Sequence, residues 1–205
     1  MKPYNSKLKM VIMGDTNVGK TSIITRISKD TFGDALLTIG ASFLTYDYNY
    51  IRYEIWDTAG SEKFLALSPM YSRGSHISLL VYDLSNLESI NRLQKYFKII
   101  EHNTCNQSKI IVIGNKLDLI NVKDLLQTQK NIVDKIKNMT SLKIETFLYV
   151  SAKNCDNIDV LNNTFTKIGE SLALNSMLSI DKNIIYLDDM VDSTAIDNAY
   201  FDCGC

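Results

Sequence analysis

The segment Gly14–Thr21 has the pattern G-x-x-x-x-G-K-T, which is typical of a phosphate-binding loop. Backbone N–H groups of such a loop and the N-terminus of the helix after it together bind an anion. An apolar run ends at Met13 and a helical pattern covers residues 21–28, as this arrangement requires. We therefore predict that Lys20 contacts the outer phosphates of a nucleotide and that Thr21 binds Mg²⁺. The alternative is a glycine-containing turn with an exposed lysine.

Asp57 and Gly60 lie at the end of a second apolar run, within the tetrapeptide Asp-Thr-Ala-Gly. A carboxylate at a strand end can hold Mg²⁺ through a water molecule. Glycine lets a backbone amide approach the terminal phosphate. By itself the tetrapeptide is equally compatible with a simple turn, but beside a phosphate loop it favours a nucleotide site.

Two polar motifs follow later strand patterns: Asn115, Lys116 and Asp118 come after residues 109–113, and Ser151, Ala152 and Lys153 come after residues 146–150. The Asp118 carboxylate can accept hydrogens from N1 and the exocyclic amine of guanine, a donor pair that adenine lacks. A backbone amide of the second motif can meet the guanine carbonyl. Either motif is weak alone, but their order after successive strands predicts a guanine site.

The elements that must position these residues alternate between strand and helix. Short apolar runs rich in β-branched residues predict buried parallel strands over 9–13, 77–82, 109–113 and 146–150. Apolar residues at helical spacing predict two helices: Ile90, Leu93, Phe97 and Ile100 mark one, and Ile158, Leu161, Phe165, Ile168 and Leu172 the other. Residues 41–57 alternate with period two and predict an antiparallel hairpin that turns near 47–49. Ser85 and Glu88 have capping-box spacing. The alternation predicts an α/β fold.

The composition excludes several classes of protein. The 205 residues are 45% hydrophobic and 22% charged with a net charge of −1, which excludes disorder over most of the chain and a protein-wide nucleic-acid-binding surface. No apolar run reaches the roughly 18 residues of a membrane-spanning helix, and residues 1–7 lack the core of a secretory signal. Residues 175–205 carry six Asp against one Lys, a net charge of −5, so the rest of the chain carries +4. We predict a nucleotide-binding domain over 1–174 and a flexible acidic tail over 175–205.

Together these motifs resemble the Ras superfamily of small GTPases and, within it, the Rab family. The resemblance covers residues 7–174 and the last three, and its Rab-like stretches are 38–43 (TIGASF), 55–60 (IWDTAG), 71–74 (YSRG) and 80–83 (LVYD). It implies a P-loop small-GTPase fold, with a six-stranded, mostly parallel sheet that has one antiparallel edge strand and is flanked by five helices. The implied function is a GTP/GDP-regulated switch in vesicle trafficking that hydrolyses GTP with Mg²⁺.

The resemblance also implies roles for individual residues. Thr38 would bind Mg²⁺ and sense the γ-phosphate, Phe32 would lie against the guanine, and Lys20, Thr38, Gly60 and Ser61 would occupy the catalytic positions. The Mg²⁺ site would comprise Thr21, Thr38 and, through water, Asp57. Further nucleotide contacts would come from Asp15, Thr16, Asn17, Val18, Gly19, Thr21, Ser22, Asn115, Lys116, Asp118, Ser151, Ala152 and Lys153.

The sequence departs from the Rab pattern in three places. Ser61 stands where the family usually has the glutamine that orients the attacking water, so we expect slow intrinsic hydrolysis. The interval from Thr21 to Thr38, which leads into the first switch, is one residue shorter than usual, and Leu36 and Leu37 lie near the place of the usual tyrosine. Ser42 replaces an acidic residue, which bears on the identity of effectors and regulators.

The chain ends in Cys203-Gly204-Cys205, which resembles the Rab Cys-x-Cys signal for double geranylgeranylation. The other interpretation is two incidental thiols. Two lipid chains satisfy the need for two anchoring signals, whereas the acidic tail would be repelled by an anionic leaflet. The four cysteines are too few for a disulfide framework, which fits a reducing cytosol. The expected location is the cytoplasmic face of an intracellular membrane, in exchange with the cytosol.

The resemblance implies several partners: exchange factors, activating proteins, escort and GDP-dissociation-inhibitor proteins, and effectors that bind the switch segments. Nucleic acid is not expected. The apolar side chains over 64–71 are either core or a partner-binding patch, and the family favours the patch. Two other functions stay open. One is a hydrolysis-impaired, GTP-locked scaffold, which Ser61 and the short first switch favour. The other is a P-loop nucleoside or nucleotide kinase, which would not explain Asn115, Lys116 and Asp118 or the terminal cysteines.

Overall fold

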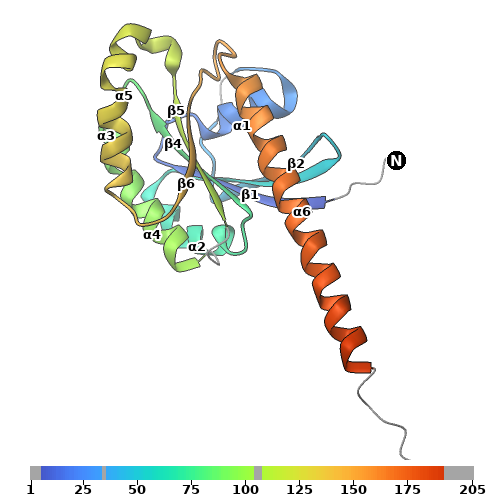
Figure 1. The fold of residues 1–205 in the computed structure, drawn as a ribbon. Coiled ribbons are helices and arrows are strands. Elements are labelled where there is room, and N and C mark those ends of the chain that lie inside the picture. Colours follow the sequence, from blue (N-terminus) through green and yellow to red (C-terminus); the bar gives the residue numbers. More distant parts are fainter. Residues whose placement is uncertain (1–5, 34–35, 104–107, 192–205) are drawn as a thin grey trace, which may run out of the picture. The chain divides into compact units, whose positions relative to one another are not determined.

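The computed structural model describes residues 6–33, 36–103 and 108–191 (Figure 1). Strands and helices alternate along it, as the sequence predicts. In chain order the elements are β1 (Ser6–Gly14), α1 (Lys20–Lys29), β2 (Ala41–Tyr48), β3 (Ile51–Thr58), the 3₁₀ helix η1 (Glu62–Leu67), α2 (Ser68–Ser72), β4 (Ile77–Asp83), α3 (Glu88–Asn91), α4 (Leu93–Asn103), β5 (Lys109–Asn115), the 3₁₀ helix η2 (Leu117–Leu119), α5 (Val122–Lys137), β6 (Ile144–Tyr149) and α6 (Ile158–Val191).

The strands form one six-stranded sheet in the order β2-β3-β1-β4-β5-β6. The edge strand β2 pairs antiparallel with β3, and every other pairing is parallel. The predicted sheet with one antiparallel edge strand is therefore confirmed. The chain first builds one side of β1 and then the other, so the connections diverge beside β1. The carboxyl ends of strands at such a point are where open α/β sheets bind ligands, and the phosphate-loop motif directly follows β1.

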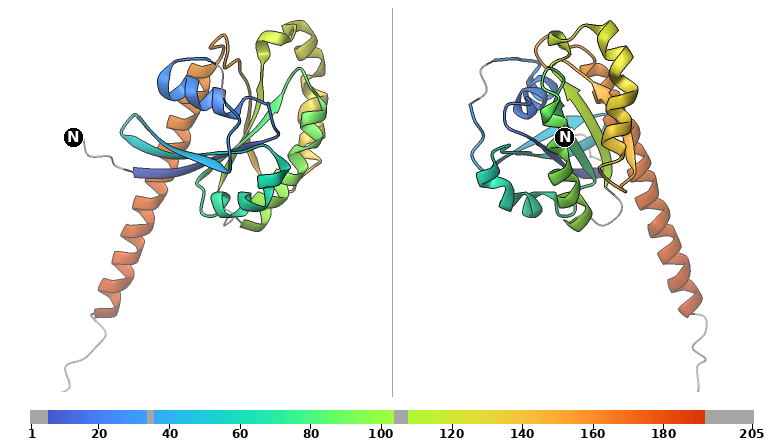
Figure 2. Two further views of the ribbon diagram at one scale, coloured as in Figure 1. Left: turned by 180° about the vertical axis from the view of Figure 1, so that it is seen from behind. Right: turned by 90° about the vertical axis from the view of Figure 1, so that its left-hand side faces the viewer.

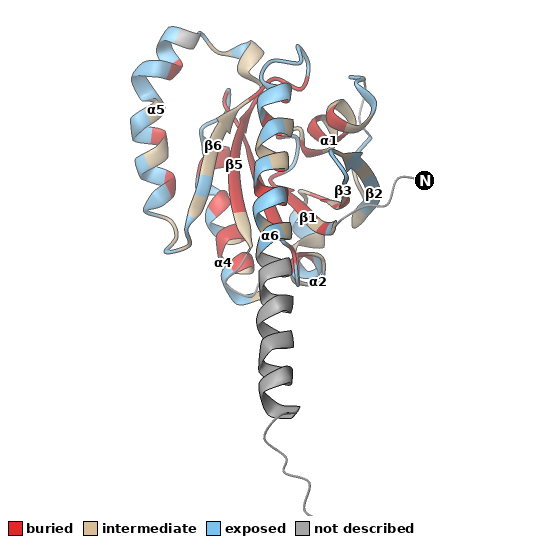
Figure 3. Ribbon diagram, turned by 45° about the vertical axis from the view of Figure 1, so that its right-hand side comes forward, coloured by how far each residue is buried: buried red, intermediate tan, exposed pale blue. Residues whose placement is uncertain are grey.

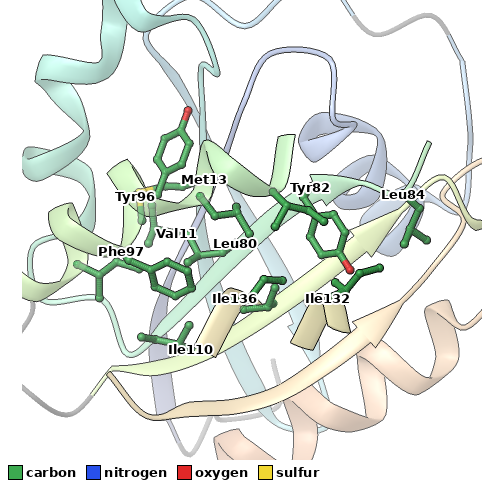
Figure 4. Packing of buried hydrophobic residues seen from close by; sticks show 14 of the residues in the cluster. Val11, Met13, Leu80, Tyr82, Leu84, Tyr96, Phe97, Ile110, Ile132 and Ile136 are labelled. Carbon is green, nitrogen blue, oxygen red and sulfur yellow. The ribbon is translucent and has the colours of Figure 1, made fainter. Parts of the chain in front are cut away.

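Helices cover both faces of the sheet (Figure 2). Alternate residues of β1 face opposite sides. Val11 and Met13 join a core cluster with residues of β4, β5, α4 and α5, and Met10 and Ile12 are equally buried on the opposite face. Figure 4 shows this cluster, in which side chains of the central strands meet Phe97 and Ile136. The central strands are buried along most of their length (Figure 3), which explains their near-continuous apolar runs.

The helix predicted around Ile90 to Ile100 is interrupted once, at Arg92, which separates α3 from α4. The predicted apolar face is buried, at Ile90, Leu93, Phe97 and Ile100. If α3 and α4 count as one interrupted helix, the described residues contain the expected five helices.

The capping box predicted for Ser85 and Glu88 is wrong. The backbone N–H and the hydroxyl of Ser85 both donate to Asp83 Oδ1, at 2.8 and 2.6 Å. The side chain of Asn86 instead accepts from the Glu88 N–H, at 3.2 Å. A carboxylate two residues earlier thus captures the serine that the local pattern assigned to the helix.

The predicted hairpin is present and turns slightly later than expected, at Asn49 and Tyr50. Both residues have positive φ, 46° and 64°, as in the two-residue turns whose twist matches that of the flanking strands. In β3 the residues alternate between buried and half-buried, which is the period-two pattern of the sequence.

The chain divides into two compact units, Met1–Gly169 and Glu170–Cys205. Helix α6 continues to Val191, into the segment predicted as a tail. The division into a domain over 1–174 and a tail over 175–205 stays a prediction. Among the described residues, no helix is long and apolar enough to cross a membrane.

Candidate nucleotide-binding site

The loop between β1 and α1 has the backbone geometry of a tight anion-binding turn. Asn17 and Gly19 have φ of 62° and 91°, in the left-handed region. A Cβ at Gly19 would lie 2.2 Å from Asn115 Nδ2, so no larger residue fits there. The short loop thus turns the chain into the N-terminus of α1, where backbone N–H groups are free to bind an anion.

Lys20 opens α1 and is buried. Its Nζ donates to the backbone carbonyl of Asp15, at 2.7 Å. Burial lowers the pKa of Lys20 to about 8, although the charges of Asp57 and Asp15 oppose the shift. A desolvated ammonium group beside the loop is a strong partner for phosphate oxygens, because little water remains to screen it.

The proposed Mg²⁺ ligands lie together. Thr21 Oγ1 donates to Asp57 Oδ2 at 2.7 Å and is 3.1 Å from Thr38 Oγ1. The other carboxylate oxygen, Asp57 Oδ1, is buried and has no hydrogen-bond partner in the described part of the chain. Burial raises the pKa of Asp57, despite the hydrogen bond from Thr21 and the charge of Lys20.

These residues fit Mg²⁺. A buried, unpartnered carboxylate oxygen costs free energy that a cation or its bound water would recover. One carboxylate with hydroxyl groups, phosphate oxygens and waters is the ligand set that Mg²⁺ prefers. The described residues contain no cluster of three or more His, Cys, Asp or Glu side chains that could hold a metal ion.

Gly60 packs directly on the phosphate loop. A Cβ at Gly60 would lie 2.4 Å from the carbonyl carbon and oxygen of Asp15 and 2.5 Å from the nitrogen of Thr16. Only glycine allows this approach between the end of β3 and the loop. Ser61 follows at the start of η1, so the position where the family carries glutamine lies next to the phosphate loop.

A pocket of about 550 Å³ opens beside these residues. Its lining comes from three segments, namely the phosphate loop with the start of α1, the first switch, and the segment after β3. The residues are Thr16, Asn17, Gly19, Lys20, Thr21, Ser22, Leu36, Leu37, Thr38, Ile39, Gly60, Ser61, Lys63 and Phe64. The structure therefore brings the predicted phosphate, Mg²⁺ and catalytic residues to one place.

The base motifs do not line this pocket but are joined to it by Asn115. The Asn115 Nδ2 donates to the carbonyl of Val18 at 2.9 Å, and its Oδ1 accepts from the Ala152 N–H at 3.2 Å. The Ser151 hydroxyl donates to Asp118 Oδ1 at 2.6 Å. One buried amide side chain thus connects the phosphate loop with both base motifs.

Two predicted base residues have other surroundings in the structure. Lys116 has φ of 66°, and its Nζ lies 2.7 Å from Asp83 Oδ2 at the end of β4. Phe32 is 47% exposed in the segment between α1 and β2. The contacts of Lys116 and Phe32 with guanine stay predictions, and Cys203 and Cys205 lie outside the described residues.

The apolar residues over 64–71 divide between the two alternatives. Leu67 and Met70 are exposed, whereas Leu65 and Tyr71 pack partly against the core cluster. The Tyr71 ring stacks on Trp56, with centroids 5.4 Å apart. This segment therefore combines core packing with an exposed apolar surface.

The sequence patterns miss two side chains near the junction of α3 and α4 that contact residues of the site. Arg92, between the two helices, forms an ion pair with the Asp15 carboxylate. The Tyr96 hydroxyl donates weakly to the Gly60 carbonyl, at 3.5 Å, and burial raises the pKa of Tyr96. Arg92 lies 77 residues from Asp15 along the chain, so no local motif could have indicated the pair.

Comparisons with known proteins agree with this geometry. A sequence model of the Ras family matches residues 9–173. Ras-related protein Rab-22A of Homo sapiens is 38% identical over 160 residues, covering 76% of this chain and 79% of that protein. GTP-binding protein YPT53 of Saccharomyces cerevisiae is 34% identical over 170 residues, with 80% and 76% covered. GTP-binding protein ypt5 of Schizosaccharomyces pombe is 33% identical over 177 residues, with 83% and 80% covered.

The matched region contains all six strands, apart from the first three residues of β1, and each motif of the nucleotide site. Ras-family proteins bind guanine nucleotide with Mg²⁺ and hydrolyse GTP. The chain belongs to the Rab family of small GTPases, within the Ras superfamily.

Proposed function

We propose that this protein is a GTP/GDP switch in intracellular membrane trafficking whose intrinsic GTP hydrolysis is slow. The observation that carries the slow rate is Ser61. It lines the phosphate pocket beside Gly60, at the position where the family usually supplies glutamine to orient the attacking water. A serine side chain is too short for that task.

The other parts of the machinery support binding and switching. Lys20 and the backbone N–H groups of the phosphate loop would hold the phosphates. Thr21, Thr38 and, through water, Asp57 would hold Mg²⁺, which neutralises phosphate charge when bound. The 3.1 Å separation of the Thr21 and Thr38 hydroxyls supports a role for Thr38 on the metal despite the shortened first switch. Contacts of Thr38 and the Gly60 amide with the γ-phosphate would order both switches, and hydrolysis would release them.

Single-turnover hydrolysis of GTP tests the role of Ser61. We expect Ser61→Gln to hydrolyse GTP about tenfold faster than the wild type or more. Ser61→Ala is the matched control and should equal the wild type, because the hydroxyl takes no part. Equal rates for Ser61→Gln and the wild type would remove Ser61 as the cause. Analysis of the nucleotide that copurifies tests guanine specificity, and tighter binding of ATP than of GTP would favour the kinase alternative.

The second candidate function is a GTP-locked scaffold that recruits partners without cycling. Ser61 favours it, as does the first switch, where Leu36 and Leu37 are largely exposed. The measurement that separates the two functions is GTP turnover with and without a Rab-directed activating domain, because such domains can supply an arginine and a glutamine in trans. Absent turnover in both conditions would identify a scaffold.

We also infer attachment to the cytoplasmic face of an intracellular membrane through geranylgeranyl groups on Cys203 and Cys205. Exchange factors, activating proteins, escort and GDP-dissociation-inhibitor proteins, and effectors would act on the switch segments. The support is the terminal Cys-x-Cys in a Rab-family chain. A double Cys203→Ser/Cys205→Ser variant should become cytosolic on cell fractionation, and its retention in the membrane fraction would contradict the proposal.

A further inference from the structure

Arg26 links the C-terminal half of α1 to the second base motif. Its Nε donates to the Ala152 carbonyl at 2.9 Å, and one terminal nitrogen donates to the Lys153 carbonyl at 3.1 Å. The other terminal nitrogen contacts the Asp30 carbonyl at 3.0 Å and the Asp30 carboxylate at 3.3 Å. The Arg26 side chain is only 13% exposed, so water competes little for these bonds.

The bond from Arg26 to the Ala152 carbonyl determines the direction of the Lys153 N–H in the second base motif. The peptide between Ala152 and Lys153 is planar, so its C=O and N–H point in opposite directions. Because Arg26 holds the carbonyl on the α1 side, the Lys153 N–H faces away from α1. The neighbouring Ala152 N–H donates to Asn115, and Ser151 donates to Asp118. The amide held by Arg26 therefore belongs to the loop that carries the predicted guanine contacts.

The contact with Asp30 fixes the start of the first switch. Asp30 ends α1 in the left-handed conformation, with φ of 51°. It stands two residues before Phe32, the residue expected against the face of the base. The Arg26 guanidinium thus holds two segments. One is the 151–153 loop, which is expected at the edge of the guanine ring, and the other is the start of the first switch, which is expected at the face of the ring. A planar fork of donors suits this task, whereas an ammonium group could not reach the three carbonyls together.

We propose that Arg26 is a positioning residue for guanine. It aims the Lys153 N–H toward the guanine carbonyl and ties this loop to the start of the first switch. Arg26 itself does not touch the nucleotide. The proposal rests on the proposed function as a guanine-nucleotide switch.

The test compares GDP dissociation from the wild type, Arg26→Gln and Arg26→Lys. We expect Arg26→Gln to release GDP about tenfold faster or more, as for the loss of buried hydrogen bonds to a charged group. Arg26→Lys should restore little, since lysine lacks the planar fork. Arg52→Gln is the matched control, because Arg52 also makes a two-bond pair, with the exposed Asp47, and it should behave as the wild type.

A nucleotide without the guanine carbonyl separates positioning from general destabilisation. The diphosphate of 2-aminopurine riboside keeps the 2-amino group and lacks the oxygen at C6 together with the hydrogen on N1, a loss that is the same for the wild type and the variant. In Arg26→Gln its affinity should change less than twofold while the affinity for GDP falls about tenfold. Hydrogen exchange at residues 152–154 of the GDP-bound protein should be faster in Arg26→Gln than in Arg52→Gln.

Three outcomes would overturn the inference. One is unchanged GDP release in Arg26→Gln, and another is unchanged exchange at 152–154. The third is an equal loss of affinity for both nucleotides, which would assign Arg26 to general folding. A wild type that does not bind GDP would instead overturn the proposed function, so the two failures are distinguishable.

Discussion

The phosphate loop and the first switch line the same pocket but are held in contrasting ways. The loop is held to β5 by the bond from Asn115 to the Val18 carbonyl and to Arg92, between α3 and α4, by the ion pair with Asp15, and Gly60 packs on its backbone. In the first switch, Leu36, Leu37 and Ile39 are 90%, 79% and 81% exposed. The contacts of this segment with the domain include one between hydroxyls, Thr38 with Thr21, and one backbone bond from Ala59 to the Gly40 carbonyl.

This difference in packing suits the phosphate loop to binding the nucleotide and the first switch to sensing its terminal phosphate. A segment with few buried contacts opens at low free-energy cost, whereas a loop braced by the sheet opens only with much of the domain. The phosphate loop can therefore bind either nucleotide in one conformation. The first switch can change conformation when a single phosphate group is present or absent.

The largest effect on nucleotide affinity is expected at the buried ammonium group of Lys20. Lys20→Met should weaken GDP binding about 100-fold or more, because the phosphates lose a desolvated charge partner. Leu37→Ala, which alters the lining that the first switch contributes to the same pocket, should change the affinity less than about twofold. Titration calorimetry with GDP and Mg²⁺ measures both. A loss in Leu37→Ala comparable to that in Lys20→Met would break the contrast between the two regions.

An intermediate effect is expected where the loop meets the segment after β3. Gly60→Ala places a methyl group against the Asp15 backbone, so the free energy of unfolding should fall by about 1–3 kcal/mol. Gly33→Ala is the matched control, because a Cβ at Gly33 meets nothing within 4 Å. Urea denaturation of the two variants measures the difference. Equal free energies of unfolding for Gly60→Ala and Gly33→Ala would show that the phosphate loop can move away from an added methyl group at little cost, as the first switch can.

The smallest effect is expected at Asp83, which pairs with Lys116 of the first base motif. Burial alone would raise the pKa of Asp83, but hydrogen bonds from Lys116 and Ser85 and the charge of Lys116 lower it below its ordinary value. A carboxyl with a lowered pKa stabilises the fold above its ordinary pKa, and this contribution disappears as the pH falls through the folded pKa.

Wild type should therefore be more stable than Asp83→Asn at pH 7, and the difference should shrink below about pH 4. Urea denaturation at pH 7 and at successively lower pH checks this. A difference that does not vary with pH would mean that the Lys116–Asp83 pair does not brace the loop electrostatically.

Much of the fold could be predicted from local patterns. The central strands are long apolar runs because both of their faces are buried, and the hairpin alternates because one side of β3 is less covered. The phosphate, Mg²⁺ and base residues follow strand ends, and parallel strands bring such ends to one edge of the sheet. The order of the motifs along the chain was therefore enough to predict which loops would meet.

The remaining features depend on partners that are distant in sequence or on local competition. Arg26 lies 126 residues from Ala152, and Arg92 lies 77 residues from Asp15. The capping box failed because Asp83 competes for the hydroxyl of Ser85. The extension of α6 to Val191 lies in the segment interpreted as a flexible tail because of its acidic charge, although Met177, Ile180, Ile184, Leu187 and Val191 recur there at helical spacing.

The close approach of Gly19 to Asn115 has a consequence for how this protein can evolve. A larger residue at Gly19 requires a smaller one at Asn115, but a smaller residue there gives up the bonds to Val18 and Ala152. Neither position can drift alone without passing through a weakly binding intermediate. The residues allowed in the phosphate loop and in the base loop therefore constrain each other, although 97 residues separate Asn115 from Val18.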